Sequence, residues 1–501
     1  MLNNRHREGM GVEKAALAQE EEEEEEDRLT PLLPHSTNLS SSSTSSLHST
    51  LLSRNGNIWT AVAHIITGVI GSGVLSLAWS MSQLGWIAGP LSIVFFALMS
   101  LLSAFLLCEC YRSPHPHFGP SRNASYMDAV KAILGKWSVW LCDIFFRLNL
   151  FKTGVVYIIT SGISMRAIQQ SNCYHKDGHK ASCEYEDTSY MLLFGIVQIF
   201  VSQIPDFSDT KWLSIIAAIM SFTYAGIGSA LGVTKVIGDG QIKGSIQGAP
   251  AATTIQKVWS SCQALGDVAF GFNYALILLN IQDTLRSPPE EKATMKKASV
   301  ISTSITTFFY LCCGGFGYAA LGNSTPGNLL TGFGFYEPYW LLDFANACIV
   351  LHLVGGYQVY SQPQFALVER SFVEKFPDSV FVCKNFPVKL PWLPSFSLNL
   401  LRLCFRTAYV ALTITIGMIF PYFNQVVAVA GAFTYWPLVI HFPLEMYLVQ
   451  KNIRPYTGKW VALRIYSAIA LLVAMFALVG SIEGLVSAKF GSNYGSRASR
   501  M

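Results

Sequence analysis

Thr67-Gly-Val-Ile-Gly-Ser-Gly-Val-Leu-Ser76 is the most informative segment of the chain, because it places Gly68, Gly71 and Gly73 in the middle of an otherwise apolar run. Glycine destabilises a helix interior and lets another backbone or a ligand approach closely. In lipid, unwound backbone is tolerated only where it lines a cavity or is buried in protein. Transporters use such interruptions to aim free amide groups at an anionic group of the substrate. The same spacing is also typical of a close-packed helix interface, so this stretch alone leaves both interpretations open.

A second interruption, in the sixth apolar run, favours a binding site. Residues 264–274 read Ala-Leu-Gly-Asp-Val-Ala-Phe-Gly-Phe-Asn-Tyr, with Gly266, Asp267, Gly271 and Asn273 inside a membrane-length segment. Matched interruptions in the first and sixth spans are what an inverted repeat of five plus five helices produces, with the site between them at mid-membrane. We therefore predict a transporter architecture in which helices 1 and 6 are broken.

The composition predicts an all-α integral membrane protein. Of 501 residues, 51% are hydrophobic and 13% charged, and the mean hydropathy is +0.37, which is too apolar for a soluble globular chain. One bilayer crossing takes about 20 apolar residues. We expect about eleven transmembrane helices, near residues 58–81, 86–110, 139–167, 190–204, 212–237, 258–281, 298–321, 339–368, 401–420, 424–448 and 460–486. Net charge is only +4, without one basic stripe, which argues against a nucleic-acid partner.

The first 56 residues are unlike the rest of the chain. An acidic run from Glu20 to Asp27 and a Ser/Thr-rich stretch at 36–53 predict a disordered tail. No apolar segment typical of a cleaved signal peptide precedes the first span. With the tail in the cytosol, most loop lysines and arginines fall on the cytosolic side, as the positive-inside rule requires. We expect a cytosolic tail at 1–56, a transporter domain at 57–490 and a short extracellular tail at 491–501.

Eleven cysteines are present, and most lie inside or at the ends of apolar runs, where a free cysteine behaves as a small hydrophobe. Cys173 and Cys183 instead share a polar loop, residues 171–188, on the outer side in this topology. A disulfide can persist there. We predict a bond between Cys173 and Cys183, with two unpaired thiols as the alternative.

Ionisable residues inside spans are costly and mark functional positions. His64 lies one turn before Gly68, His352 lies midway along the eighth span, and Asp267 lies beside the second interruption. Histidine exchanges a proton near physiological pH, so these three residues are candidates for proton coupling. The alternative for each histidine is a neutral imidazole that bonds a neighbouring helix.

Other chemistries find little support in the sequence. It contains no Walker A phosphate loop, no clear metal-binding cluster and no nucleophile with a base at a revealing spacing. We therefore expect a protein that is not an enzyme and needs no metal or cofactor other than a co-transported proton. A membrane-embedded transferase, supported by His352 alone, is a remote alternative.

Long stretches of the chain resemble plant amino acid permeases of the amino acid/auxin permease family. The matching stretches are GSGVLSLAWSMSQLGWIAGP at 71–90, FGIVQIFVSQIPDF at 194–207, residues 221–224, IQDTLRSPP at 281–289, PGNLLTGFGF at 326–335, PYWLLD at 338–343 and GYQVY at 356–360. The resemblance covers nearly everything after residue 56. It implies a proton-coupled importer of neutral and some charged amino acids, built on the LeuT-type inverted repeat plus one extra C-terminal helix, in the plasma membrane.

The resemblance also implies a substrate site. In the family the first interruption holds the carboxylate and amino group of the substrate, and the sixth helix opposes it. The residues at these positions are Gly68, Val69, Gly71, Ser72 and Gly73, with Phe270, Phe272 and Asn273 opposite. His64 and His352 match histidines that recur in the family.

Two positions depart from the family pattern. Lys152 stands in the third span where a small residue is usual, and Asn280 stands where glutamate is common. A lysine near mid-membrane needs a counter-charge, water or a changed protonation state. Lys152 is therefore a further proton-coupling candidate, and we expect altered coupling or a preference for acidic amino acids. The alternative is a lysine that reaches a cytosolic vestibule beside Arg147.

Other functions on the same scaffold remain open. One is a carrier of auxin or of another small organic acid or amine. Another is an amino acid sensor that binds without transport, which the long tail and Lys152 favour. The sequence leaves the selectivity, the oligomeric state and the choice between proton and sodium coupling undecided.

Overall fold

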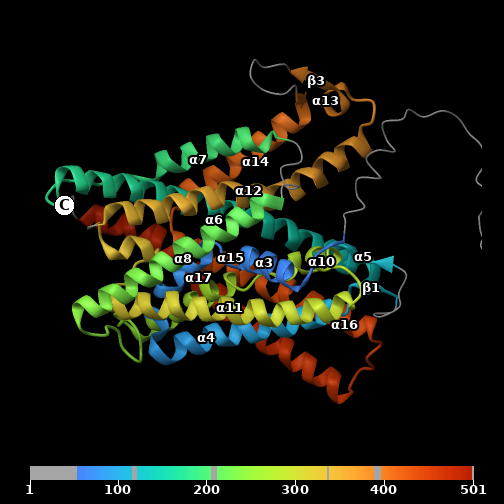
Figure 1. The fold of residues 1–501 in the computed structure, drawn as a ribbon, viewed down its shortest axis with the longest axis horizontal. Coiled ribbons are helices and arrows are strands. Elements are labelled where there is room, and N and C mark those ends of the chain that lie inside the picture. The colour runs from blue at the N-terminus through green and yellow to red at the C-terminus, as the bar shows by residue number, and fades with distance from the viewer. Residues whose placement is uncertain (1–53, 115–120, 205–210, 336–337, 389–395, 499–501) are drawn as a thin grey trace, which may run out of the picture. The chain divides into compact units, whose positions relative to one another are not determined.

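The computed structural model describes residues 54–114, 121–204, 211–335, 338–388 and 396–498. The acidic run and the Ser/Thr-rich stretch of the expected tail lie outside these residues, as does the end of the expected C-terminal tail. The described chain is helical apart from two short hairpins (Figure 1). In these, β1 (Arg112–Ser113) pairs with β2 (Ser121–Arg122), and β3 (Asn385–Val388) pairs with β4 (Phe396–Asn399), both antiparallel.

The helices follow the apolar runs of the sequence. In chain order they are α3 (Ile58–Val69), η1 (Ser72–Ser76), α4 (Leu77–Cys108), α5 (Tyr126–Ile133), α6 (Lys136–Asp177), α7 (Asp187–Ser202), α8 (Lys211–Asp239), α9 (Thr254–Phe270), α10 (Ala275–Asp283), α11 (Glu291–Leu321), η3 (Gly322–Ser324), η4 (Leu329–Phe333), α12 (Tyr339–Lys375), α13 (Val380–Cys383), α14 (Leu400–Ile419), α15 (Phe423–Thr434), η5 (Tyr435–His441), α16 (Phe442–Gln450) and α17 (Gly458–Ala498). The all-helical class is as predicted.

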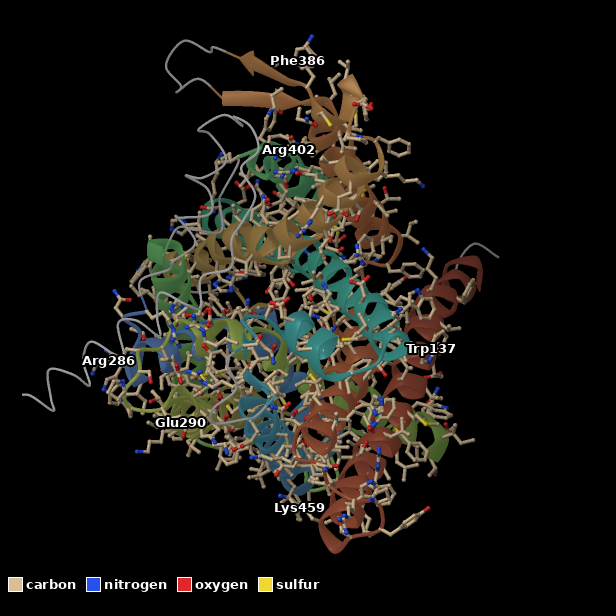
Figure 2. The ribbon with its side chains drawn as sticks, turned by 90° about the vertical axis from the view of Figure 1, so that its right-hand side faces the viewer. Trp137, Arg286, Glu290, Phe386, Arg402 and Lys459 are labelled. Carbon is tan, nitrogen blue, oxygen red and sulfur yellow. A yellow bond between two sulfur atoms is a disulfide. The ribbon has the colours of Figure 1, made fainter. Side chains whose placement is uncertain are left out.

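Eight helical segments of the described chain are long and apolar enough to cross a membrane. They are Ser72–Cys108, Ile216–Asp239, Thr254–Asp283, Glu291–Ser324, Tyr339–Lys375, Leu400–Ile419, Phe423–Gln450 and Gly458–Phe490. Two further apolar helices, α3 and α7, are shorter, and the expected span at 139–167 lies within α6. Large apolar side chains such as Leu91 and Phe476 are exposed, as is Trp137 (Figure 2). Exposed apolar side chains at this density suit contact with lipid.

A bend at Gly85 shapes the region where the first two expected spans meet. Gly85 has a φ of 81° inside α4, a conformation that L side chains rarely adopt. A Cβ at Gly85 would lie 2.1 Å from the carbonyl oxygen of Ile246, in the loop after α8. Glycine is therefore required both for the bend and for the close packing of that loop.

Close packing also fixes α9, the helix before the second interruption. α9 packs against both α15 and α17. A Cβ at Gly431 of α15 would lie 2.1 Å from the carbonyl oxygen of Gly266 and 2.7 Å from the backbone nitrogen of Phe270. The absence of a side chain at Gly431 thus lets α15 approach the last turn of α9.

Polar contacts join the start of α3 to the end of α10. Backbone hydrogen bonds connect Gly56 with Thr284 and Arg286. Arg54 forms an ion pair of 2.7 Å with Glu291, the first residue of α11. These contacts connect the segment before α3 with the segment after α10. The start of α3 is therefore held close to the end of α10.

A buried tyrosine belongs to the same group of polar contacts. The hydroxyl of Tyr111 donates a 2.6 Å hydrogen bond to the Asp283 carboxylate and accepts one from Arg54. Burial, together with the negative charge of Asp283, raises the pKa of Tyr111. The hydroxyl therefore keeps its proton and serves as a donor to Asp283.

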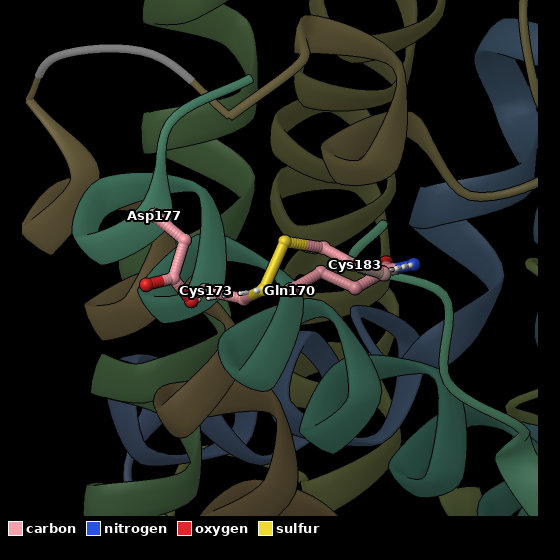
Figure 3. The surroundings of a disulfide bond; sticks show 4 residues. All are labelled: Gln170, Cys173, Asp177 and Cys183. Atoms are coloured by element: carbon pink, nitrogen blue, oxygen red, sulfur yellow. Dashed lines mark hydrogen bonds between the residues drawn. A yellow bond between two sulfur atoms is a disulfide. The ribbon is translucent and has the colours of Figure 1, made fainter. Parts of the chain in front are cut away.

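The expected disulfide is present in the loop between α6 and α7. Cys173 in the last turns of α6 is bonded to Cys183, and the Gln170 side chain donates a hydrogen bond to the Cys183 carbonyl oxygen (Figure 3). The bond closes a short loop, because only 10 positions separate the two cysteines. It therefore ties the end of α6 to the segment that leads into α7.

Candidate substrate site

The two glycine-rich stretches lie next to each other inside the protein. α3 ends at Val69 and η1 begins at Ser72, whereas α9 ends at Phe270 and α10 begins at Ala275. A Cβ at Gly73 would lie 3.0 Å from a ring carbon of Phe270. The non-helical backbone of each stretch thus lies close to the other stretch. The buried backbone N–H and C=O groups in this region need hydrogen-bond partners.

A small cavity of about 30 Å³ lies between the two stretches. It is lined by Gly68, Val69, Gly71, Ser72, Gly73, Asn149, Thr153, Tyr157, Phe270, Gly271, Asn273 and Tyr360. Seven of the eight residues expected to bind substrate are therefore in this lining. The exception is Phe272, whose buried ring packs against Tyr310 with the ring centroids 5.2 Å apart. The Phe272 side chain does not face the cavity, contrary to the expectation, because the chain turns between Phe270 and Phe272.

One tyrosine contacts the backbone of both stretches. The hydroxyl oxygen of Tyr310, on α11, lies 2.7 Å from the carbonyl oxygen of Val69 and 3.0 Å from that of Gly271. Tyr310 is fully buried. Its one hydroxyl proton is therefore shared between carbonyl groups on both sides of the site, and the shared contact holds the two stretches next to each other.

Serine hydroxyls reach two more carbonyl groups of the stretches. Ser221 of α8 donates a 2.8 Å hydrogen bond to the carbonyl oxygen of Ile70. Ser100 of α4 donates a 3.0 Å hydrogen bond to the carbonyl oxygen of Phe272. Neighbouring helices thus supply donors for the backbone carbonyl groups that the interruptions expose.

The donor groups at the start of η1 have no such partners. Among the described residues, no hydrogen bond reaches the backbone N–H of Ser72 or Gly73, or the buried hydroxyl of Ser72. On the opposite stretch, Asn273 uses its side-chain nitrogen for a bond to Asn149, while its buried Oδ1 has no partner. The cavity therefore offers donors on one wall and an acceptor on the other, which complements a carboxylate and an ammonium group.

Asn149 holds the second stretch in place. Its side-chain oxygen accepts a 3.0 Å hydrogen bond from Asn273 and a 3.1 Å hydrogen bond from Thr434 of α15. Asn149 and Thr153 both line the cavity, and neither was expected to do so. In the sequence, Asn149 and Thr153 are two polar residues one turn apart in the apolar part of α6. This spacing places both side chains on one helix face and is the feature that points to them.

A larger cavity of about 490 Å³ adjoins the small one and shares Gly68, Tyr157 and Tyr360 with it. The remaining lining residues are His64, Thr67, Ser125, Tyr126, Met127, Phe146, Leu150, Ala217, Leu276, Ile277, Asn280, Ile281, His352, Gly355, Gly356, Val359, Pro363 and Leu367. None of the described residues that line either cavity is Asp, Glu, Lys or Arg. The larger cavity has the volume for an uncharged side chain and offers no counter-charge for an ionised one.

Comparison with known proteins identifies the family. A family model described as transmembrane amino acid transporter protein matches residues 54–487. The chain belongs to this family. It is 56% identical over 449 residues to probable amino acid permease 7 of Arabidopsis thaliana, covering 89% of this chain and 96% of that relative. Amino acid permease 3 of the same plant is 52% identical, with 86% and 91% covered. The resemblance to plant amino acid permeases is therefore confirmed, and the family is one of transporters, not of enzymes.

Solved structures similar to this transporter have the LeuT-type fold. MhsT, solved in complex with L-phenylalanine, aligns with a TM-score of 0.53 at 10% identity, covering 84% of this chain and 98% of MhsT. Mhp1, a nucleobase-cation-symport-1 family transporter with bromovinylhydantoin bound, aligns with a TM-score of 0.52 at 11% identity, covering 87% and 92%. At these identities the similarity concerns the fold alone.

Both histidines proposed for proton coupling line the larger cavity of the transporter. Nδ1 of the buried His352 lies 3.1 Å from the carbonyl oxygen of Ala217 and 3.3 Å from the hydroxyl of Ser221. Because a carbonyl oxygen only accepts, this geometry assigns the ring proton to Nδ1 and leaves Nε2 as the acceptor. Ser221 in turn donates to Ile70, so His352 is connected to the first interruption through one hydroxyl.

Asp267 is placed differently from the histidines. It is fully buried on α9, and its Oδ2 lies 3.4 Å from the hydroxyl of Ser80 on α4, whereas its Oδ1 has no hydrogen-bond partner among the described residues. It lines neither of the two cavities described above. Asp267 therefore borders the interface between α4 and α9 and has no direct contact with the small cavity.

Lys152 also lies outside both cavities. Its Nζ donates a hydrogen bond to the carbonyl oxygen of Ala430 on α15 and lies 5.2 Å from the centroid of the Phe270 ring. Arg147, its expected companion, is paired with Asp143 at 2.7 Å. Lys152 thus points toward α15 and the end of α9, and the interpretation in which it reaches a vestibule beside Arg147 is wrong.

Proposed function

We propose that this transporter carries amino acids across the membrane together with protons, by alternating access around the small cavity. The observation that carries the proposal is the set of groups there that have no hydrogen-bond partner in the described part of the chain, the N–H groups of Ser72 and Gly73 and the Oδ1 of Asn273. A substrate carboxylate satisfies the donors and a substrate ammonium satisfies the acceptor. The permease relatives support the same substrate class.

The substrate side chain extends into the larger cavity. The small cavity, at about 30 Å³, has room only for the polar groups, whereas the adjoining cavity of about 490 Å³ has room for a side chain. Because its described lining carries no ionised group of fixed charge, we expect a preference for neutral amino acids. This replaces the expectation of a preference for acidic substrates, which depended on Lys152 facing the substrate.

Proton coupling is assigned to the histidines of the larger cavity. His64 and His352 border the space beside the bound substrate, and His352 contacts the first interruption through Ser221. A proton on His352 Nε2 adds positive charge to the larger cavity, which adjoins the cavity proposed to hold the substrate carboxylate. Asp267 and Lys152 are secondary candidates because they lie outside the cavities.

The membrane arrangement follows the sequence expectation. We propose eleven spans, with α3 and η1 as the broken first helix, α9 and α10 as the broken sixth helix, and α17 as the extra helix of a five-plus-five repeat. The N-terminus is cytosolic and the C-terminus extracellular, because the loop lysines and arginines concentrate on the side of the N-terminus. The membrane is the plasma membrane of a plant cell, and the direction is import.

The proposal is tested by recording current and uptake together in oocytes that express the protein. Labelled neutral, acidic and basic amino acids and indole acetate are compared across external pH, for the wild type, His352→Ala and the control His179→Ala in an exposed loop. We expect an inward current that requires a neutral amino acid, grows with external acidity, and loses most of its pH dependence in His352→Ala alone. A current insensitive to pH contradicts proton coupling. Accumulation of indole acetate instead favours an auxin carrier, and saturable binding without accumulation favours a sensor.

A further inference from the structure

Few groups near Lys152 can form an ion pair or a hydrogen bond with its side-chain nitrogen. Its side chain borders a third, apolar cavity of about 220 Å³ between α6, α14, α15 and α17, whose other lining residues are Leu148, Phe151, Val155, Ile416, Phe420, Val426, Val429, Ala430, Phe433 and Leu485. No carboxylate is among these residues, and no ion pair of Lys152 is found in the described part of the chain. Its recorded contacts are the carbonyl oxygen of Ala430 and the face of the Phe270 ring.

These two contacts repeat a pattern one turn away on the same helix. Asn149 contacts α15 at Thr434 and the second interruption at Asn273. Lys152 contacts α15 one turn earlier, at Ala430, and the end of α9 at Phe270. The second interruption is thus held at both ends between α6 and α15, by one contact pair at Asn149 and by another at Lys152.

Phe270 connects Lys152 to the substrate cavity. The ring lines the small cavity and lies against Gly73 of the opposite stretch, where a Cβ would come within 3.0 Å of it. Lys152 is not part of that lining, so the ring separates the ammonium group from the substrate. In an apolar environment the attraction between an ammonium and an aromatic face is stronger than at an exposed site.

We propose that Lys152 is a positioning residue for substrate binding, which acts by holding the Phe270 ring in place as one wall of the substrate cavity. The inference rests on the proposed function and deepens it, because it assigns a role to the residue that departs from the family pattern. Loss of the charge frees the ring to leave its position, so the cavity loses part of its complementarity to the amino acid. The affinity for substrate falls, whereas the rate at saturating substrate changes little.

The test compares substitutions that separate charge from hydrogen bonding. Lys152→Arg keeps a cation over the ring, Lys152→Gln keeps a donor for Ala430 without the charge, and Lys152→Met keeps only the length. Uptake of the preferred neutral amino acid is measured against concentration and normalised to the amount of protein at the cell surface. We expect KM to rise about tenfold in the Met and Gln variants and to stay within about twofold of wild type in the Arg variant. The control Lys136→Met, at the exposed start of α6, leaves KM unchanged.

A double substitution tests whether the effect passes through Phe270. In a Phe270→Leu background, Lys152→Met is expected to change KM by less than about twofold, because the partner ring is already gone. Full additivity of the two changes overturns the proposal, as does a Gln or Met variant with a wild-type KM. If the wild type shows no saturable uptake of any amino acid, the proposed function fails and the inference fails with it. If the wild type transports and KM does not respond to the charge, only the inference fails.

Discussion

The hydroxyl of Tyr310 donates a 2.7 Å hydrogen bond to the carbonyl oxygen of Val69, the last residue of α3. The same hydroxyl lies 3.0 Å from the carbonyl oxygen of Gly271, just after α9. A residue of the long helix α11 thus contacts the backbone of both interruptions, and the two interruptions border the small cavity.

Removing this hydroxyl is expected to damage the site. Tyr310→Phe removes the one hydroxyl proton that these two buried carbonyl groups share, a loss that costs about 1–3 kcal/mol. We expect a lower melting temperature of the purified protein and at least about a tenfold loss of uptake per surface copy. Tyr224→Phe is the matched control, because the Tyr224 hydroxyl lies 3.4 Å from the Ile70 carbonyl, which Ser221 already satisfies. Equal effects of the two substitutions would argue against a special role for Tyr310.

The partnerless hydroxyl of Ser72 gives a prediction about affinity. Ser72→Ala removes a donor to the substrate carboxylate, so KM is expected to rise about tenfold with little change in melting temperature. Ser76→Ala provides the control, because the buried Ser76 hydroxyl already bonds the carbonyl oxygen of Gly73 and lines neither cavity. Concentration-dependent uptake measures both variants. A Ser72→Ala transporter with unchanged KM would contradict the placement of the carboxylate.

Two glycines with positive φ provide a stability test. Gly85 and Gly178 have φ values of 81° and 78°, but only Gly85 has backbone atoms where a Cβ would stand. Gly85→Ala is therefore expected to abolish most surface expression, since it adds a clash with Ile246 to the conformational strain. Gly178→Ala bears the strain alone, which costs about 1–3 kcal/mol, and should retain most expression. Surface biotinylation compares them, and similar losses would contradict the clash argument.

The disulfide between Cys173 and Cys183 provides a test of orientation and stability. Closing a loop of this length removes about 2–3 kcal/mol of chain entropy from the unfolded state, so Cys173→Ser is expected to lower the melting temperature. If the loop is extracellular, a membrane-impermeant reductant followed by an impermeant thiol label modifies both cysteines on intact cells. Labelling only after the cells are permeabilised would place this loop in the cytosol and reverse the proposed topology.

Some residues of the candidate site could be predicted from the sequence, whereas others could not. Gly68, Val69, Gly71, Ser72, Gly73 and Phe270 line the cavity as expected, because glycine runs and membrane-length apolar segments are local properties of the chain. Asn149 was missed, because one asparagine in an apolar helix does not reveal which face is buried. Phe272 was placed incorrectly in the lining, because a turn of a few residues decides which of two neighbouring phenylalanines faces the substrate.

Three features could be predicted from the sequence: the helical membrane class, the positions of the apolar runs, and the positions at which two of those runs are interrupted. Each of these features depends on residues that are close together in the chain. Only the tertiary structure decided that Tyr310 joins the two interruptions, that Asn149 and Lys152 turn toward α15, and that no charged residue lines the described cavities. Long-range packing decides the direction in which a side chain leaves a helix and the residue that it contacts. Local sequence patterns do not predict that packing.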